Sequence, residues 1–68
     1  MTTITIELEL WCGNTITCET LQTDLPLSGD LFRDSDIVSD YLRGLVGNAV
    51  GYYNAYNMNG SLVATSEC

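Results

Sequence analysis

Residues 2–12 read TTITIELELWC, a strict alternation of polar and apolar side chains. Neighbouring side chains of a β-strand point to opposite faces, so this pattern predicts a strand that buries one face. The apolar side chains of this strand are Ile4, Ile6, Leu8, Leu10 and Cys12. Its polar face carries Thr3, Thr5, Glu7, Glu9 and Trp11. The strand decides the fold, because the other elements of the chain have to cover its apolar face.

A hairpin is predicted to follow this strand. Residues 13–14 are Gly and Asn, which tolerate a turn, and residues 15–21 resume with β-branched and apolar side chains. A two-residue loop would place Ile16 and Cys18 on the polar face of the first strand, whereas a three-residue loop over residues 13–15 would keep them on the apolar face. We therefore predict the three-residue loop.

The next segment predicts a connection and then a helix. Residues 22–34 lose the strand period and contain several turn-forming residues, as connections do. Asp34 or Ser35 then provides an N-cap, and Asp36 in the first turn favours the helix dipole. The apolar residues at helical spacing are Ile37, Val38, Tyr41, Leu42, Leu45 and Val46. We expect the helix to end near Gly47, because continuing it would place several glycines in a helix interior.

A second hairpin completes the predicted fold. Residues 49–56 are rich in aromatic and β-branched side chains, residues 57–60 end in the hairpin signal Asn-Gly, and residues 61–66 resume the strand pattern. The chain is therefore predicted to be α+β, with an antiparallel sheet of two hairpins in ββαββ order and one helix packed on one face. Residues 1–68 are predicted to form a single domain, since a chain of this length buries one small core.

The charge of the chain is strongly unbalanced. Nine Asp and Glu residues stand against Arg33 and Arg43, and the lack of Lys and His leaves a net charge of −7. Such a chain repels nucleic acid and anionic membranes, and its charge suits basic protein surfaces, cations or solubility alone. The sequence shows neither a stretch of 18 apolar residues nor a signal-peptide pattern, so it predicts a cytoplasmic protein that contacts neither membrane nor nucleic acid directly.

The cysteines and acids do not suggest a metal site. Cys12, Cys18 and Cys68 are odd in number, which does not suit a disulfide framework. A bridge between Cys12 and Cys18 across the hairpin is conceivable, but we interpret the cysteines as buried free thiols. Without His a zinc site would need carboxylates, and the run of acids from Asp30 lacks the Gly and Glu of an EF-hand loop. We predict no metal and no cofactor.

The usual parts of an enzyme are missing as well. No His is present to titrate near neutrality or to activate a Cys nucleophile, and the sequence has no Gly-rich phosphate loop or Gly-x-Ser-x-Gly turn. A hydrolase with paired carboxylates would need a substrate cleft, for which a chain this small has little material. We therefore predict that the protein is not an enzyme.

The carboxylates of the first hairpin are candidates for binding a partner. In the predicted register Glu9 lies opposite Glu19 and shares its face with Glu7, and no Lys relieves the repulsion between them. The arrangement fits two interpretations. It is either a solvated sheet face or an acidic patch that imitates the phosphates of DNA toward a site rich in Lys and Arg.

Aromatic side chains add to this candidate surface. Tyr41 lies on the apolar stripe of the helix and is predicted to be in the core. The adjacent residues Tyr52 and Tyr53 point to opposite faces of a strand, so one of them lies outside, as Trp11 does. Exposed aromatics beside acids suit a protein interface, and packing within the sheet accounts for them equally well. The candidate partner-binding residues are Glu7, Glu9, Trp11, Glu19, Asp34, Asp36 and Asp40.

In size, acidity and hairpin-plus-helix pattern, the chain resembles the small phage-encoded anti-CRISPR proteins of the acidic DNA-mimic kind. The resemblance rests on the missing Lys and on the acids of the hairpin and the helix start, which are Glu7, Glu9, Glu19, Asp34, Asp36 and Asp40. It implies a non-enzymatic inhibitor that binds a basic, DNA-recognising surface of a type I CRISPR-Cas effector complex, type I-C among the subtypes. Such an inhibitor blocks target DNA binding by acidic mimicry in the cytoplasm of the host bacterial cell.

Two other functions fit the same sequence. A small structural or assembly protein of a phage would use the Tyr-rich second hairpin as an edge and would self-associate strongly. An antitoxin-like regulatory protein would instead bind one basic toxin. A measurement of molecular size would detect the self-association expected of the assembly protein. Capture and identification of the bound partner would detect the toxin expected of the antitoxin-like protein.

Overall fold

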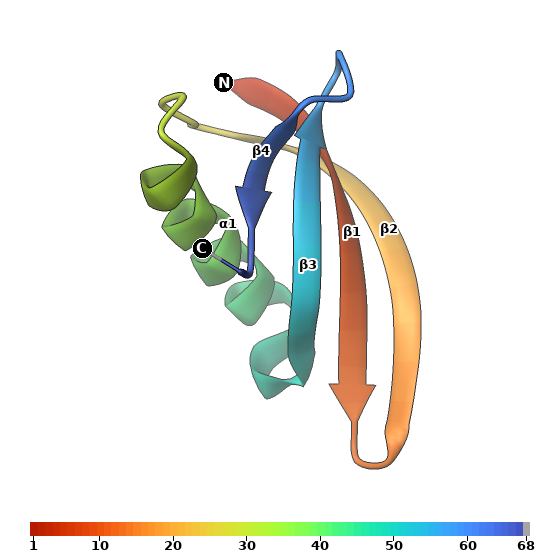
Figure 1. Cartoon of the computed structure of the whole chain (residues 1–68). Helices are drawn as coiled ribbons and strands as arrows, with labels where there is room; N and C mark the ends of the chain where they lie inside the picture. Colours follow the sequence, from red (N-terminus) through yellow and green to blue (C-terminus); the bar gives the residue numbers. More distant parts are fainter. Residues whose placement is uncertain (68) are drawn as a thin grey trace.

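Four strands and one α-helix make up the structure, a computed structural model that describes residues 1–67. The elements are β1 (Thr2–Cys12), β2 (Thr15–Leu25), α1 (Leu31–Val46), the 3₁₀ turn η1 (Gly47–Ala49), β3 (Val50–Asn57) and β4 (Leu62–Thr65). The strands form one antiparallel sheet in the order β2-β1-β3-β4, and α1 covers one face of it (Figure 1). The predicted α+β fold in ββαββ order is confirmed.

The core lies between α1 and the sheet. Ile4, Ile6 and Leu8 of β1 are buried, so the face of residues 2–12 that was predicted to be buried forms the centre of the core. The side chains that complete the core are Val38 and Leu42 of α1, Tyr53 and Ala55 of β3, and Ala64 of β4. Because α1 lies mainly against β4 and β3, the edge strand β2 extends outside the area that the helix covers.

Tyr53 joins the helix to the sheet through hydrogen bonds. Its buried hydroxyl donates to the Ser35 carbonyl at 2.7 Å and lies 2.7 Å from the Ser39 hydroxyl, with which it is also hydrogen-bonded. The Ser35 hydroxyl donates to the Leu31 carbonyl at 2.6 Å and accepts from the Thr65 N–H of β4 at 3.1 Å. These bonds fix the position of α1, because a buried polar group without a partner costs free energy.

The helix begins one turn earlier than the sequence predicts. Asp30 is the N-cap, and its carboxylate accepts from the backbone N–H groups of Phe32 at 3.0 Å and Arg33 at 3.5 Å. The prediction of a cap at Asp34 or Ser35 is therefore wrong. Asp30 is an equally suitable cap by residue type, and it precedes them by one turn.

The end of the helix agrees with the prediction, and its apolar stripe agrees in part: Val38 and Leu42 are buried, whereas Leu45 is 55% exposed. α1 ends at Val46, and Gly47 follows as the C-cap with a φ of 65°, a left-handed value that favours glycine. Tyr41 is partly buried against the core, as predicted. Within residues 1–67, no helix has the length and apolarity needed to cross a membrane.

The register of the first hairpin differs from the prediction. β1 and β2 are joined by Gly13 and Asn14 alone, and Trp11 pairs with Ile16. Gly13 has a φ of 63°. Among the described residues every positive φ belongs to a glycine, so the φ of Asn14 is negative. This combination is that of a type II′ hairpin turn, which has glycine in its first central position. The prediction of a three-residue loop over residues 13–15 is wrong, because this two-residue turn matches the twist of the paired strands.

The two-residue loop places Ile16 and Cys18 on the face of the sheet away from α1, beside Trp11 and Glu9. The helix-side residues of β2 from its start to Glu19 are exposed, so no apolar cover exists there for Ile16 and Cys18 to join. The tip of the β1–β2 hairpin extends beyond the helix, which gives the molecule its elongated shape of 35 × 19 × 19 Å (Figure 1).

Candidate functional site

The face of the sheet away from α1, named the outer face below, is the candidate binding site. Its residues are Thr3, Thr5, Glu7, Glu9 and Trp11 of β1, Ile16, Cys18, Thr20, Gln22 and Asp24 of β2, Tyr52, Asn54 and Tyr56 of β3, and Leu62 and Thr65 of β4. Near the hairpin turn it carries Trp11, Tyr52 and Ile16, which are 44%, 57% and 61% exposed. These three residues are named the aromatic end. Large apolar side chains gathered in the open indicate an interaction surface.

Contacts with β3 and β1 hold Trp11 in place. Its indole lies over Gly51, where an added Cβ would come 2.8 Å or less from three indole atoms. Its ring meets Tyr52 edge-to-face, with ring centroids 5.4 Å apart and an interplanar angle of 81°. The indole N–H donates to the Glu9 carboxylate at 3.1 Å. These contacts give a large aromatic side chain one orientation beside a carboxylate.

A β-bulge in β3 makes room for this packing. Where β1 has Glu9 alone between two paired residues, β3 has both Gly51 and Tyr52. The extra residue keeps Val50 on the helix side, packed against the core, and leaves Gly51 beneath Trp11. Bulges bend a strand and change the direction of its side chains, and this bulge places Gly51 and Tyr52 against the Trp11 indole.

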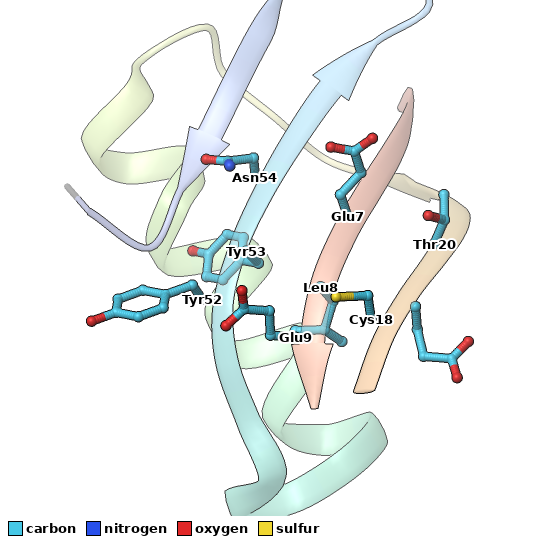
Figure 2. A pocket seen from close by; sticks show the side chains of 9 residues that line it. Glu7, Leu8, Glu9, Cys18, Thr20, Tyr52, Tyr53 and Asn54 are labelled. Atoms are coloured by element: carbon cyan, nitrogen blue, oxygen red, sulfur yellow. The ribbon is translucent and has the colours of Figure 1, made fainter. Parts of the chain in front are cut away.

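An open depression of about 340 Å³ lies beside the aromatic end. Figure 2 shows the side chains of the outer face around it, which are Glu7, Glu9, Cys18, Thr20, Tyr52 and Asn54. Glu7 and Glu9 are two residues apart on one strand, so their Cα atoms are about 6.8 Å apart. Because α1 lies on the opposite face, the depression stays open and suits a protruding side chain of a partner better than an enclosed substrate.

The two arginines lie on the other side of the molecule. Arg33 and Arg43 are exposed on α1 with Asp36 and Asp40, and the Arg43 guanidinium is 3.6 Å from the Asp40 carboxylate. That helix surface therefore has as many cations as carboxylates. The sequence has no other Arg or Lys, so no such side chain compensates the carboxylates of the outer face.

The structure brings together some of the predicted partner-binding residues and separates others. Those that lie together on the outer face are Glu7, Glu9 and Trp11. Glu19 pairs with Leu8 and belongs to the helix side of β2, so the predicted pairing of Glu19 with Glu9 is wrong. Asp36 and Asp40 are exposed on α1, across the sheet from the outer face. The exposed acids among the predicted residues therefore lie in three places: on the outer face, on the helix side of β2 and on α1.

Asp34 is buried and bound within the chain. It is 1% exposed, and its carboxylate accepts hydrogen bonds from the Ser28 N–H at 2.8 Å, the Ser28 hydroxyl at 2.9 Å and the Gly29 N–H at 2.9 Å. Burial raises the pKa of Asp34, but these hydrogen bonds and the charge of Arg33 outweigh it, so the pKa lies below its ordinary value. We therefore leave Asp34 out of the proposed surface.

Cys12 and Cys18 are free and exposed. The interpretation of buried thiols is wrong for both, because the end of the hairpin extends past the helix. The register places Cys12 on the helix side and Cys18 on the outer face, so a bridge between them would break the strand pairing. Cys68 lies outside the described residues. Within residues 1–67, no group of three or more His, Cys, Asp or Glu side chains is arranged to hold a metal ion.

Sequence reasoning missed Ile16 and Gly51 as parts of the site. Ile16 was missed because its face depends on the hairpin register, whereas an isolated glycine in a strand pattern, such as Gly51, is a signal for a bulge or a close approach. The prediction that either Tyr52 or Tyr53 lies outside is confirmed, and the exposed residue is Tyr52. Comparison with known protein families, curated proteins and solved structures finds no match for the chain.

Proposed function

We propose that this protein is a non-enzymatic binding protein that docks its outer face on a basic surface of another protein. The observation that carries the proposal is the separation of charge: both arginines are on α1, while Glu7 and Glu9 are on the opposite side of the sheet. Trp11, held beside Glu9, adds an apolar anchor of the kind found at the centre of protein interfaces. Complementary charge would steer the partner, and the aromatic end would supply affinity.

We further propose that the basic surface is one that recognises DNA. A chain with a net charge of −7 repels phosphate and is suited to take the place of DNA on a protein. Glu7 and Glu9 would stand in for successive phosphates. The resemblance to anti-CRISPR proteins implies, as the first partner to test, a type I effector complex and type I-C among the subtypes. Occupying its DNA-recognising surface would block target DNA binding.

Two double variants with the same change in charge test this proposal. Glu7→Gln/Glu9→Gln removes two carboxylates from the outer face, whereas Asp36→Asn/Asp40→Asn removes two from the exposed side of α1. Since both raise the net charge equally, a non-specific effect of charge would be the same in both. We expect the outer-face variant to bind the type I-C effector complex about tenfold more weakly or worse, and the helix variant to bind as the parent does.

Binding kinetics at two salt concentrations complete the test. Association should slow markedly when salt rises from about 0.1 M to about 1 M, because the Debye length falls from about 10 Å to about 3 Å. An outer-face variant that binds like the parent, or equal losses in both variants, would refute docking through the outer face. If the effector complex does not bind at all, strong self-association favours the phage assembly protein, and capture of one basic toxin favours the antitoxin-like protein.

A further inference from the structure

Strand β2 forms an open edge of the sheet. It stands first in the order β2-β1-β3-β4, so within the described residues β1 is its single neighbour. It spans Thr15–Leu25, and its pairing with β1 shows no register shift. Figure 1 shows β2 at this edge of the sheet. The backbone N–H and C=O groups of β2 that do not pair with β1 therefore face outward.

The hairpin turn determines which residues of β2 face outward. The pair that flanks a two-residue turn, here Cys12 and Thr15, is hydrogen-bonded, and hydrogen-bonded pairs alternate with open pairs from there along the ladder. The residues of β2 in the open pairs direct their N–H and C=O groups to the free edge, and they are Ile16, Cys18, Thr20, Gln22 and Asp24. The free edge therefore has the pattern of donors and acceptors that an added antiparallel strand needs.

The two edges of the sheet differ in how they are protected. At the opposite edge, β4 is short and packs against α1. β2 contains no Pro, and its pairing with β1 contains no bulge, although natural edge strands use these devices to prevent further pairing. Its charged side chains, Glu19 and Asp24, are both acidic, so they oppose pairing with an acidic strand and not with a basic one. Residues 15–20 are all exposed. β2 is thus the edge that is open to another strand.

We propose that β2 accepts an extended basic segment of a partner protein as a fifth strand. This inference rests on the proposed function, because it specifies how the basic partner is held. Charge complementarity decides the occupant: Glu19 and Asp24 are the charged side chains of β2, and Glu9 lies next to it on the outer face. A second copy of the chain would bring the same carboxylates to the edge, and its Arg33 and Arg43 lie on α1.

The added strand would lie about 4.8 Å from β2, and its side chains would alternate between the two faces. Those on the helix side would reach Glu19, where α1 leaves β2 uncovered. Those on the outer side would extend the outer face beyond Ile16 and Cys18. Backbone hydrogen bonds would supply affinity whatever the sequence of the segment, and the carboxylates would select for Lys and Arg.

Two synthetic peptides distinguish strand addition from attraction between charges alone. Both have the sequence of alternating Lys and Thr and the same charge, and the second carries an N-methyl group on every residue, which removes its backbone donors. Fluorescence anisotropy should show that the methylated peptide binds the unmodified protein about tenfold more weakly or worse, because several ladder hydrogen bonds are lost together. Equal binding of the two peptides, or no binding of either, would overturn strand addition.

A pair of variants at one outward-facing residue gives a second measurement. Thr20→Pro removes an outward N–H without removing a bond to β1, and Thr20→Val keeps it. We expect Thr20→Pro to bind the unmethylated peptide about tenfold more weakly than Thr20→Val does, because both variants lack the Thr hydroxyl and only Thr20→Val keeps the outward N–H. Equal affinities would contradict the proposal. So would a dimer of the parent protein that Thr20→Pro converts to a monomer, because the edge would then belong to a second copy.

These results can fail separately from the proposed function. If Glu7→Gln/Glu9→Gln loses the effector complex while both peptides bind alike, docking through the outer face stands and strand addition falls. If the peptides differ as expected while Glu7→Gln/Glu9→Gln binds the complex like the parent, strand addition stands and docking through the outer face falls.

Discussion

Replacing Gly51 by Ala fills the space that the Trp11 indole occupies. The new Cβ would come 2.8 Å or less from three indole atoms, too close for carbon contacts, so the ring has to leave its place. The loss includes the edge-to-face contact with Tyr52, about 0.5–1.5 kcal/mol, and the exposed hydrogen bond to Glu9, about 0.5–1 kcal/mol. Ala in a strand regains about 0.5–1 kcal/mol over Gly. The net expectation is a destabilisation of about 1 kcal/mol.

Gly44→Ala is the matched control for this substitution. Gly44 lies in α1, and apart from the adjacent residues and the nearby helix backbone no heavy atom is within 4 Å of a Cβ added to it. Removing a glycine from a helix interior stabilises a protein by about 1 kcal/mol, so the same chemical change should have opposite signs at residues 51 and 44. A chain of this length changes its Tm by about 4–8 °C per kcal/mol, which places the two variants about 10 °C apart.

Thermal unfolding followed by circular dichroism gives the stabilities, and tryptophan emission gives the environment of the ring. Trp11 is the one tryptophan of the chain, so its emission reports this site alone. We expect Gly51→Ala to shift the emission to the red and to weaken partner binding, and Gly44→Ala to change neither. A Gly51→Ala variant that is stabilised like Gly44→Ala, with unchanged emission, would refute the packing of Trp11 on Gly51 and the fixed orientation of the aromatic end.

Two further predictions concern buried polar groups, one in the first turn of α1 and one between α1 and β3. Asp34→Asn should lower the free energy of unfolding at pH 7 by about 2 kcal/mol in urea titrations, because a buried carboxylate that accepts three hydrogen bonds is replaced. The pKa of Asp34 is lower in the folded chain than in the unfolded one. The difference in unfolding free energy between the parent and Asp34→Asn should therefore be full above the unfolded pKa of about 4 and should shrink as the pH falls through the folded pKa. A difference that stays constant with pH would contradict the role of the Asp34 carboxylate. Tyr53→Phe should lower the free energy of unfolding by about 1–2 kcal/mol, since the Ser35 carbonyl loses a buried donor. The control Tyr52→Phe should change it very little. Equal losses in the two variants would contradict the role of the Tyr53 hydroxyl.

The parts of the fold that were predictable are those that a local pattern determines. The alternation over residues 2–12 gave β1 its observed bounds, because one buried face imposes a period of two. Gly47 marked the end of the helix through its backbone conformation. The start of the helix was not predictable in this way, because Asp30 and Asp34 are both suitable caps. The choice between them depends on the folding of residues 28–29 onto the Asp34 carboxylate, which is a tertiary contact.

The same distinction applies to the candidate site. Glu7, Glu9 and Trp11 could be placed together because they alternate on one strand. The place of Glu19 depends on the register of two strands, and the choice of register depends on how far the helix extends over them. No residue near Glu19 carries that information, so the prediction assumed an apolar cover that α1 does not provide. Ile16 was misplaced for the same reason.

The register of the hairpin decides the chemical character of the outer face. A three-residue loop would have placed Glu19 there with Glu9, giving a patch dominated by carboxylates. The observed two-residue loop places Ile16 there instead, 61% exposed, beside Trp11. A polar side chain at residue 16 would suit an uncovered face better, so an exposed Ile next to an ordered Trp and two carboxylates favours a face that a partner covers. Such a face would orient its partner by charge and hold it by apolar contact, which favours docking on a basic protein surface over a sheet face that is only solvated.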